Sequence, residues 1–577
     1  MEIQPVPVSE QVKALLAAND LPIDDLDDRS IAVYGASEGG RLIGVVGVQL
    51  LDGTALLLSL AALALPAQKA APDTAVLRKR TTYEDLQMFS QVLNQIRVNH
   101  PDSIDSHELL MAAIEGMVHA ADPHSFIIPN VRLSPAREQA FKEGKLVPIP
   151  IEFEYRAGAP IVTAVASGTA AARQDILPGD ELIAIDGKPV TAGSAEELNV
   201  MLSGEKGSST TLSVQRLRAD GTLARLDRTV KREKIGETTA VPAVFMLDAG
   251  AGTGYVRITS FMNEKVADDL HDALGKLEGK GMHRLILDLR DNGGGSVSEA
   301  AHVAGEFLPK GTIVYTSEGR KAVDTDTGRV SRSFWRSERR YPIVLLVNAG
   351  TASASELVAG ALQDHDRALI VGHTTFGKSL LMRGFPMADG SMIELVVGHV
   401  RTPCGRIIQR QYHGVTLHDY YRLAGADRDT ASRPSCRTDG GRTVYGGGGI
   451  YPDVRLADAP SAPGWLERAA EADLPLKWTG AWVTANASAL STIDALAASP
   501  ALPAAAIADF RAYATKDGIA IPADAESDAM LQRVLVRNVA AEKWGDEGYY
   551  RLAAETSSEV AAASGAFGKA QSILATR

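Results

Sequence analysis

Two residues that could carry out acyl transfer lie close together in the sequence, a serine at a predicted helix start and a lysine that follows a glycine. The apolar run Ile343–Val347 predicts a buried strand, and from Ser355 onward apolar residues recur at helical spacing. Ser353 is therefore expected at or just before a helix N-terminus, where backbone N–H groups favour a developing anion. Lys378, which follows Gly377, could act as the base. Taken alone, each residue also fits a plain structural role, as a helix cap or a surface charge.

A run of three glycines could supply the anion-binding turn that such a nucleophile needs. The segment Asp288-Leu-Arg-Asp-Asn-Gly-Gly-Gly295 follows the apolar residues Leu285–Leu287, which predict a second buried strand. Glycines allow backbone N–H groups to approach a substrate without obstruction from side chains. Loss of one oxyanion-binding donor costs an enzyme roughly 3–4 kcal/mol of transition-state stabilisation. A tight strand-to-helix turn is the alternative interpretation of the glycines alone.

Length and composition limit the class of protein. A chain of 577 residues exceeds a single core and predicts about three to five domains. The hydrophobic content of 45% with 23% charged residues is typical of globular protein, and a net charge of −12 argues against nucleic acid as a partner. Two cysteines exclude a disulfide scaffold and a four-cysteine zinc site. One disulfide between Cys404 and Cys436 and two buried thiols are equally compatible with the sequence.

The order of the predicted elements indicates an α/β multidomain protein. Short β segments separated by turns change, near position 236, into strands that alternate with helices, a pattern typical of parallel pairings. No apolar run is long enough for a membrane-spanning helix. His107-Glu108 lacks the second histidine of a zinc-protease helix, so we expect no metal. The predicted domains are an N-terminal segment (1–72), a helical region (73–135), a β-rich domain (136–235), an α/β core (236–456) and a C-terminal helical domain (457–577).

Several motifs in sequence order resemble the C-terminal processing (tail-specific) proteases, the S41 serine peptidases. The resemblance covers about residues 80–456 and implies a crotonase/ClpP-like α/β protease core with an inserted PDZ-like domain. It also implies a serine endopeptidase that cleaves unfolded or C-terminal tails of polypeptides without a cofactor. The motifs are Asp122-Pro-His-Ser125, Leu177-Pro-Gly-Asp-Glu-Leu-Ile-Ala-Ile-Asp-Gly187, Asp288–Gly295, Thr351-Ala-Ser-Ala-Ser-Glu356, Thr375-Phe-Gly-Lys378 and Gly446-Gly-Gly-Gly-Ile-Tyr-Pro-Asp-Val454.

The same resemblance implies a role for each residue of the site. Ser353 would be the nucleophile and Lys378 the general base, while Ser355 would be a helix-start residue. The amides of Ser353 and Gly294 would form the oxyanion hole. A lysine base must lose its proton near neutral pH, which burial without a carboxylate partner makes possible. The absence of Asp and Glu from 371–387 agrees with this requirement.

Two departures from the family pattern favour weaker function, and they leave a catalytically impaired peptide-binding adaptor as the alternative. Met382 stands where the family places a glutamine four residues after the lysine, so we expect slow hydrolysis unless Gln409 or another polar group substitutes. In the PDZ-like carboxylate-binding loop, the family sequence Gly-Ile-Gly-Ile is replaced by Pro148-Ile149-Pro150-Ile151. Proline has no N–H, so Ile149 and Ile151 are expected in a loop that holds a substrate carboxylate weakly.

Residues 1–72 resemble the first half of an acetyl-CoA-dependent N-acetyltransferase, with an expected helix at Val8–Ala18 and strands at Ile31–Tyr34 and Leu42–Gln49. The glycine-rich loop for the cofactor pyrophosphate is missing, which predicts a truncated segment without acetyltransferase activity. The apolar run Ala55–Leu65 could instead be a displaced export signal. By family resemblance we expect an extracytoplasmic, periplasmic protein, or a cytoplasmic one if this run is not a signal.

Overall fold

The computed structural model describes most of residues 81–575 and four N-terminal strands. Gaps longer than two residues fall at 129–139, 141–144, 166–170, 191–194, 218–221, 234–238, 332–338, 416–419, 421–429 and 459–461, with isolated positions and pairs elsewhere. The chain divides into two compact units, Met1–Ile104 and Asp105–Arg577. Each unit is described separately below.

The N-terminal unit contains a four-stranded antiparallel sheet in which neighbours in sequence are neighbours in space. Its strands are β1 (Glu2–Pro5), β2 (Ile31–Glu38), β3 (Arg41–Leu51) and β4 (Thr54–Ala62). The two predicted strands lie within β2 and β3, and most of the apolar run proposed as a displaced signal forms β4. The expected helix at Val8–Ala18 lies outside the described residues.

The helix α2 (Thr82–Asn99) also belongs to this unit, and the larger unit opens with α3 (Ser106–Ala121). The start of α2 is fixed by a capping box, since the Thr81 hydroxyl accepts from the Glu84 N–H and the Glu84 carboxylate accepts from the Thr81 N–H. Both helices fall in the region predicted as helical. No helix in the described ranges is both long and apolar enough to cross a membrane.

A β-rich region with its own core follows. Its sheet has the order β13-β12-β9-β8-β7, and the helix α5 (Ala195–Leu202) contributes Leu198 and Leu202 to the core beneath. The strands are β7 (Ile151–Arg156), β8 (Ala159–Val165), β9 (Glu181–Ile185), β12 (Ser209–Leu217) and β13 (Leu223–Lys231). Because β7 is an edge strand, one side of its backbone has no strand partner within the described sheet.

The α/β core is built on a six-stranded sheet of order β14-β15-β16-β19-β20-β25, parallel from β15 onward. Its central strands β16, β19 and β20 are almost wholly apolar and buried, as expected for parallel strands covered on both faces. This confirms the predicted mixed α/β fold. The strands are β14 (Ala243–Asp248), β15 (Thr253–Arg257), β16 (Arg284–Asp288), β19 (Ile343–Val347), β20 (Leu369–Gly372) and β25 (Val454–Arg455).

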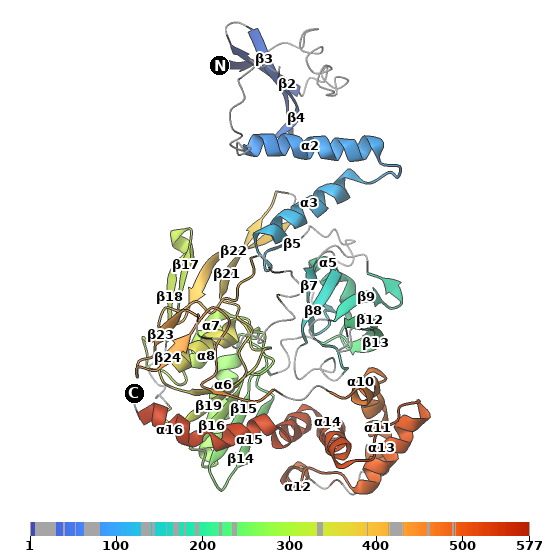
Figure 1. Ribbon diagram of the computed structural model, residues 1–577, viewed down its shortest axis with the longest axis vertical. Helices are drawn as coiled ribbons and strands as arrows, with labels where there is room; N and C mark the ends of the chain where they lie inside the picture. The colour runs from blue at the N-terminus through green and yellow to red at the C-terminus, as the bar shows by residue number, and fades with distance from the viewer. Residues whose placement is uncertain are drawn as a thin grey trace. The chain divides into compact units, whose positions relative to one another are not determined.

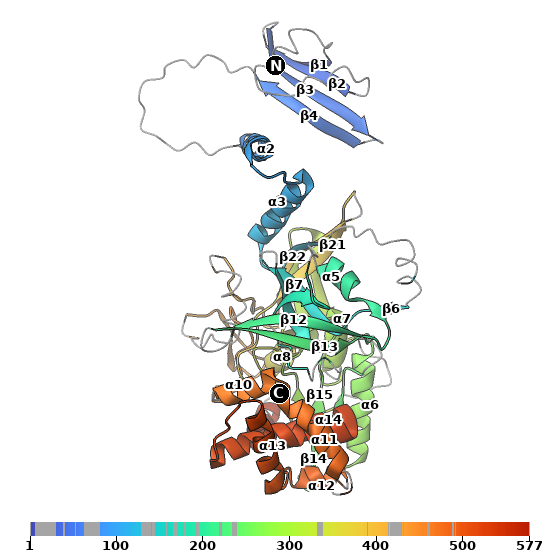
Figure 2. The same ribbon diagram turned by 90° about the vertical axis from the view of Figure 1, so that its right-hand side faces the viewer.

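Helices from distant parts of the chain cover the two faces of this sheet (Figures 1 and 2). One face packs against α6 (Val266–Gly279), α7 (Val297–Ala304) and α8 (Ala354–Asp364). The other packs against the end of α14 (Ala525–Glu555), α15 (Ser558–Gly565) and α16 (Phe567–Ala575), through residues such as Tyr550, Val560 and Phe567. The end of α14, α15 and α16 are therefore a layer of the α/β core.

The remaining C-terminal helices form a separate small core around Trp478, Phe510 and Leu535. They are α10 (Gly464–Glu471), α11 (Leu474–Asn486), α12 (Ile493–Ala498), α13 (Ala504–Lys516) and the first part of α14. The residues predicted as one helical domain thus contribute to two different cores, one of their own and one shared with the parallel sheet.

A second sheet of order β18-β17-β22-β21 lies beside the core, and β5 (Phe126–Ile128) joins it through β22. A disulfide between Cys404 and Cys436 links the loop after β22 to β23 (Ser435–Arg437), which decides between the two cysteine states that the sequence allowed. The other strands are β17 (Ile313–Gly319), β18 (Asp326–Arg329), β21 (Leu380–Pro386) and β22 (Met392–Arg401).

Candidate active site

The three segments singled out from the sequence meet at one edge of the parallel sheet. The glycine turn follows β16, Ser353 follows β19 and the segment with Lys378 follows β20, so all three leave the carboxyl ends of neighbouring strands. A methyl group added to Gly294 would lie 2.8 Å from the Cβ atom of Ser353, so the glycine turn touches the predicted nucleophile. The carboxyl edge of a parallel sheet is where α/β proteins commonly bind ligands.

Ser353 has a strained backbone. It is the N-cap of α8, with φ 54° and ψ −119°, in the region that residues with a side chain rarely adopt. Such outliers cost about 1–3 kcal/mol and persist where the surrounding structure fixes them, often at functional sites. The sharp turn between β19 and α8 leaves the Ser353 side chain half-buried at the strand edge, whereas Ser355 is fully buried one position into the helix.

This strain predicts a difference between two substitutions that both remove the Ser353 hydroxyl. Ser353→Gly is expected to be more stable than Ser353→Ala by about 1 kcal/mol, because glycine relieves the strain at positive φ by more than it adds to the entropy of the unfolded chain. Denaturant unfolding of the two variants measures the difference. Equal stability, or a more stable alanine variant, would contradict a strained Ser353.

A buried carboxylate, Glu356, joins the serine and lysine segments. Its Oε2 atom accepts from the backbone N–H groups of Ser353, at 2.9 Å, and of Lys378, at 2.8 Å. Its Oε1 atom accepts from the Gly377 N–H, at 2.7 Å, and from the Thr375 hydroxyl. Glu356 is wholly buried, and these four groups are its hydrogen-bond donors. One side chain therefore fixes the spacing between the two predicted catalytic residues.

Burial and hydrogen bonding act on Glu356 in opposite directions. Burial penalises the charged form and raises the pKa of Glu356 from 4.5 to about 7, although the hydrogen bonds from Thr375, Lys378, Gly377 and Ser353 lower it. All four partners donate, so the ionised carboxylate matches the site. A protonated carboxyl would place a fifth donor among them.

Lys378 is half-buried, and in the described part of the chain no carboxylate lies within ion-pair distance of its ammonium nitrogen. The residue that follows it is held by Gln409, whose Oε1 atom accepts from the Ser379 N–H at 2.9 Å. The Nε2 atom of Gln409 donates to the Tyr420 hydroxyl, also at 2.9 Å. That hydroxyl lies 2.9 Å from Nε2 of His124, in the Asp122–Ser125 motif. Gln409 thus supports the backbone next to Lys378.

The two amides predicted as oxyanion donors already have partners. The Ser353 N–H donates to Glu356, and the Gly294 N–H donates to the Asn292 side chain at 3.0 Å. Within the described residues, no internal hydrogen bond uses the N–H of Ala354, the first residue of α8. The same methyl group added to Gly294 would lie 2.9 Å from this amide nitrogen. Ala354 therefore presents an available donor beside the glycine turn, which the sequence did not single out.

Three further residues that the sequence analysis singled out have clear places in the structure. Ile149 and Ile151 are buried in the core of the β-rich region, at 1% and 2% exposure, so their side chains cannot contact a substrate directly. Any contact with substrate at this loop would come from its backbone. Met382 lies half-buried in β21, where the register of the pairing with β22 shifts.

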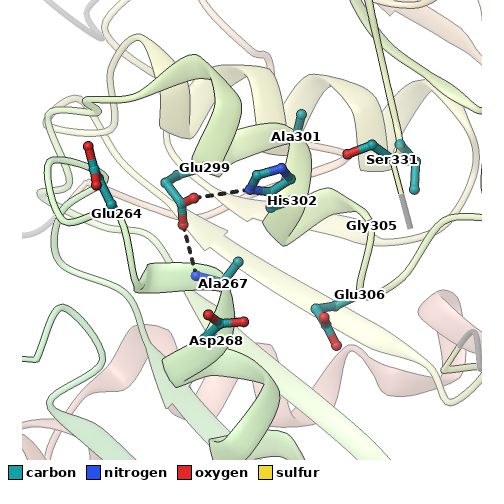
Figure 3. A pocket seen from close by; sticks show the side chains of 10 residues that line it. Glu264, Ala267, Asp268, Glu299, Ala301, His302, Gly305, Glu306 and Ser331 are labelled. Atoms are coloured by element: carbon teal, nitrogen blue, oxygen red, sulfur yellow. Dashed lines mark hydrogen bonds and ion pairs between the residues drawn. The ribbon is translucent and has the colours of Figure 1, made fainter. Parts of the chain in front are cut away.

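A hollow of about 310 Å³ opens between α6 and α7 (Figure 3). Glu299 crosses it, accepting from the Ala267 N–H at 3.1 Å, with its other oxygen 3.0 Å from Nδ1 of His302. Neither Ser353 nor Lys378 lines this hollow. No group of three potential metal ligands occurs among the residues that the structure describes.

The sequence missed Glu356, Tyr420 and Ala354 as parts of the site. The Ser-x-x-Glu pattern from Ser353 to Glu356 matches a capping box and could have identified the carboxylate. Tyr420 lies far from Lys378 in sequence without a periodic signal, so only the tertiary structure reveals it.

Comparison with known proteins agrees with this geometry. Residues 252–419 match the family model "Peptidase family S41", and residues 161–216 match "PDZ domain". The chain is 32% identical over 335 residues to the carboxy-terminal-processing protease of Bartonella bacilliformis, covering 57% of this chain and 74% of that protein. It is 35% identical over 248 residues to the chloroplastic carboxyl-terminal-processing peptidase 2 of Arabidopsis thaliana, covering 42% and 46%.

A solved structure, the photosystem II D1 C-terminal processing protease, aligns with a TM-score of 0.43 and 24% identity over 65% of this chain and 87% of that one. The similarity to the Bartonella bacilliformis protease extends over most of that protein, and the PDZ match lies within the β-rich region and the peptidase match within the α/β core. The chain therefore belongs to peptidase family S41, as a serine peptidase related to the carboxy-terminal-processing proteases.

Proposed function

We propose that this peptidase cleaves polypeptides through a dyad of Ser353 and Lys378. The Ser353 Oγ atom attacks the scissile carbonyl carbon while its proton passes to the Lys378 amine. The C–N bond then breaks, the leaving amine takes the proton from the Lys378 ammonium, and water hydrolyses the acyl-enzyme ester with Lys378 again as base. The observation that carries this proposal is that one buried carboxylate, that of Glu356, accepts hydrogen bonds from the backbone N–H groups of both residues.

We propose Ala354 as the main backbone donor to the oxyanion of the tetrahedral intermediate, together with an amide of the glycine turn. Support comes from its available N–H at the start of α8 and from its closeness to Gly294. The predicted pair, Ser353 and Gly294, would first have to give up hydrogen bonds to Glu356 and Asn292.

Hydrolysis of an unfolded protein by purified variants tests the dyad. Ser353→Ala and Lys378→Ala are both expected to reduce turnover to background, while Ser355→Ala retains measurable activity because Ser355 is buried within α8. An active Ser353→Ala variant would refute the proposal. If Ser353→Ala is inactive and Lys378→Ala is fully active, Ser353 remains the nucleophile and Lys378 is excluded as the base.

Glu356 predicts a pH dependence of its own. Labelling of the active serine by a phosphonate is expected to accelerate as pH rises through about 7, the pKa of Glu356, because only the ionised carboxylate accepts from both backbones. Stability changes in the opposite direction. Between pH 4.5 and about 7 the folded protein holds a proton that the unfolded chain has lost, so the free energy of unfolding falls as pH rises across this window and levels off above it.

The Glu356→Gln variant provides the control for both measurements. This variant has no titrating group at position 356, so its labelling rate should not rise near pH 7. Its free energy of unfolding should change less between pH 4.5 and 7 than that of the wild-type protein. A variant that keeps both features would assign them to another group.

Met382→Gln is expected to raise kcat by about two- to fivefold, because it restores the amide that the family places four residues after the lysine and improves the orientation of Lys378. Met382→Leu, which changes volume little and adds no polar group, is the matched control. Steady-state hydrolysis of one peptide measures both variants. An unchanged or lower kcat for Met382→Gln would show that Gln409 and its neighbours already suffice.

We further propose that unfolded or C-terminal tails are the substrates, with the edge strand β7 of the PDZ-like region as the docking strand. The relatives' names support tail processing, and the open edge of β7 supports strand addition. We also propose an extracytoplasmic location. The disulfide between Cys404 and Cys436 supports it, because disulfides persist in oxidising compartments.

A further inference from the structure

A carboxylate from the C-terminal helical layer reaches the strand edge that carries the proposed dyad. Glu559, the second residue of α15, forms an ion pair with Arg290 and a hydrogen bond with His373. Arg290 belongs to the segment after β16, and His373 immediately follows β20. A residue near the end of the chain therefore joins the glycine turn to the segment that contains Lys378.

Glu559 therefore bridges the two segments. At the first end of this bridge, Arg290 is nine-tenths buried and lies between two carboxylates. It forms an ion pair with the wholly buried Asp288 at 2.6 Å, and its other guanidinium nitrogen contacts Glu559 and the Ser557 hydroxyl. Asp288 also accepts from the Tyr255 hydroxyl at 2.6 Å. Arg290 is thus fixed within the core, and only Asp291 and Asn292 separate it from the three glycines.

On the second side, His373 lies between two carboxylates. Its Nε2 atom is 3.2 Å from Glu559 and its Nδ1 atom is 3.5 Å from Asp458. The backbone N–H of His373 donates to the Val347 carbonyl at the end of β19, which fixes the residue at the sheet edge. His373 begins the segment His373–Lys378, so movement here is transmitted to the proposed base over one short loop.

The strand order shows why such a bridge matters. The ends of β16 and β19 are adjacent and are joined directly, since Asp291 and Asn348 exchange two hydrogen bonds of 2.9 and 2.7 Å. The ends of β16 and β20 are separated by β19, so no ladder hydrogen bond connects them. Among the described side chains, Glu559 contacts both segments from outside the sheet.

We propose that Glu559 is a positioning residue that fixes the glycine turn and the Lys378 segment relative to one another. This inference rests on the proposed dyad. It gives the C-terminal helices a role in catalysis beyond covering the sheet, since loss of the bridge would misplace the oxyanion donor of the glycine turn relative to the base without altering either group. Small misplacements of this kind reduce turnover more than substrate binding.

Glu559→Gln tests the bridge, because it keeps the shape of the side chain and removes its charge. The matched control is Glu555→Gln in the same helical layer, where the carboxylate pairs with Arg551 at 3.1 Å. We expect Glu559→Gln to lower kcat about tenfold with KM within about twofold, and Glu555→Gln to leave both unchanged. Active-site titration with a serine-directed phosphonate normalises each kcat to folded, competent sites.

Three further variants make the outcome decisive. His373→Gln should lower kcat similarly, and the double variant Glu559→Gln/His373→Gln should be no worse than either single variant, since both act through one bridge. Should Glu559→Gln fail to fold, His373→Gln alone carries the test. Equal kcat for Glu559→Gln and Glu555→Gln, a normal kcat for His373→Gln, or additive losses would overturn the proposal. Ser353→Ala is assayed in parallel, and activity in that variant would refute the dyad itself.

Discussion

Glutamine in place of Glu356 is expected to lower turnover at least a hundredfold, with the Ser353 and Lys378 side chains still present. The carboxylate accepts from four donors in a wholly buried position, including the backbone N–H groups of both residues. An amide group of the same shape would point N–H groups at some of these donors. Unpaired buried donors cost roughly 1–3 kcal/mol each, so both segments should move apart. Misplacement of reacting groups by about 1 Å can cost a hundredfold in rate.

The control for this substitution is Glu299→Gln, another buried carboxylate that accepts from a backbone N–H, here that of Ala267 beside the hollow between α6 and α7. It should lose comparable stability and keep its turnover per titrated site. Measurement of kcat and of the free energy of unfolding for both variants separates alignment from folding. A Glu356→Gln variant with near-normal kcat would show that the carboxylate is only a helix cap.

Alanine in place of Gly294 is the second change with a large expected effect, again at least about a hundredfold in turnover. Gly294 has φ 102°, and an added methyl group would lie 2.7 Å from the Ala352 carbonyl oxygen as well as close to Ser353 and Ala354. Because these contacts are with backbone and Cβ atoms, no side chain can rotate away to relieve them. The glycine turn and the nucleophile must separate.

Gly311→Ala separates this steric effect from the conformational one. Gly311 has φ 86°, but an added methyl group there meets no atom within 4 Å. It should therefore lose about 1 kcal/mol of stability from the unfavourable backbone conformation and retain full turnover. Parallel measurement of kcat and denaturant unfolding decides the matter. Equal turnover in the two alanine variants would place Gly294 away from the reaction.

The sequence was sufficient for the parts of the site that depend on local pattern. Ile343–Val347 is apolar throughout and forms β19, and helical spacing after Ser355 forms α8. Parallel strands place the turns that follow them on one edge, so the closeness of the glycine turn, Ser353 and Lys378 also follows from the strand order. The comparison with known proteins confirms the resemblance of the chain to peptidase family S41.

Other parts of the site depend on tertiary contacts that leave no periodic signal. The occupation of the Ser353 and Gly294 amides arises from the side chains of Glu356 and Asn292, whose directions the sequence does not specify. Likewise, residues 457–577 were predicted to be helical, but no sequence pattern could show that α15 packs on the parallel sheet and carries Glu559 to Arg290. The resemblance of residues 1–72 to half of an N-acetyltransferase stays a prediction.

Mass-spectrometric mapping of a fluorophosphonate adduct tests the central claim most directly. In the wild-type protein the adduct is expected on Ser353 and on no other serine, Ser355 included, because the strained turn presents only Ser353 at the sheet edge. Lys378→Ala, folded to the same extent by circular dichroism, is expected to give no adduct. An adduct on another residue, or labelling of Lys378→Ala at the wild-type rate, would contradict the Ser353/Lys378 dyad.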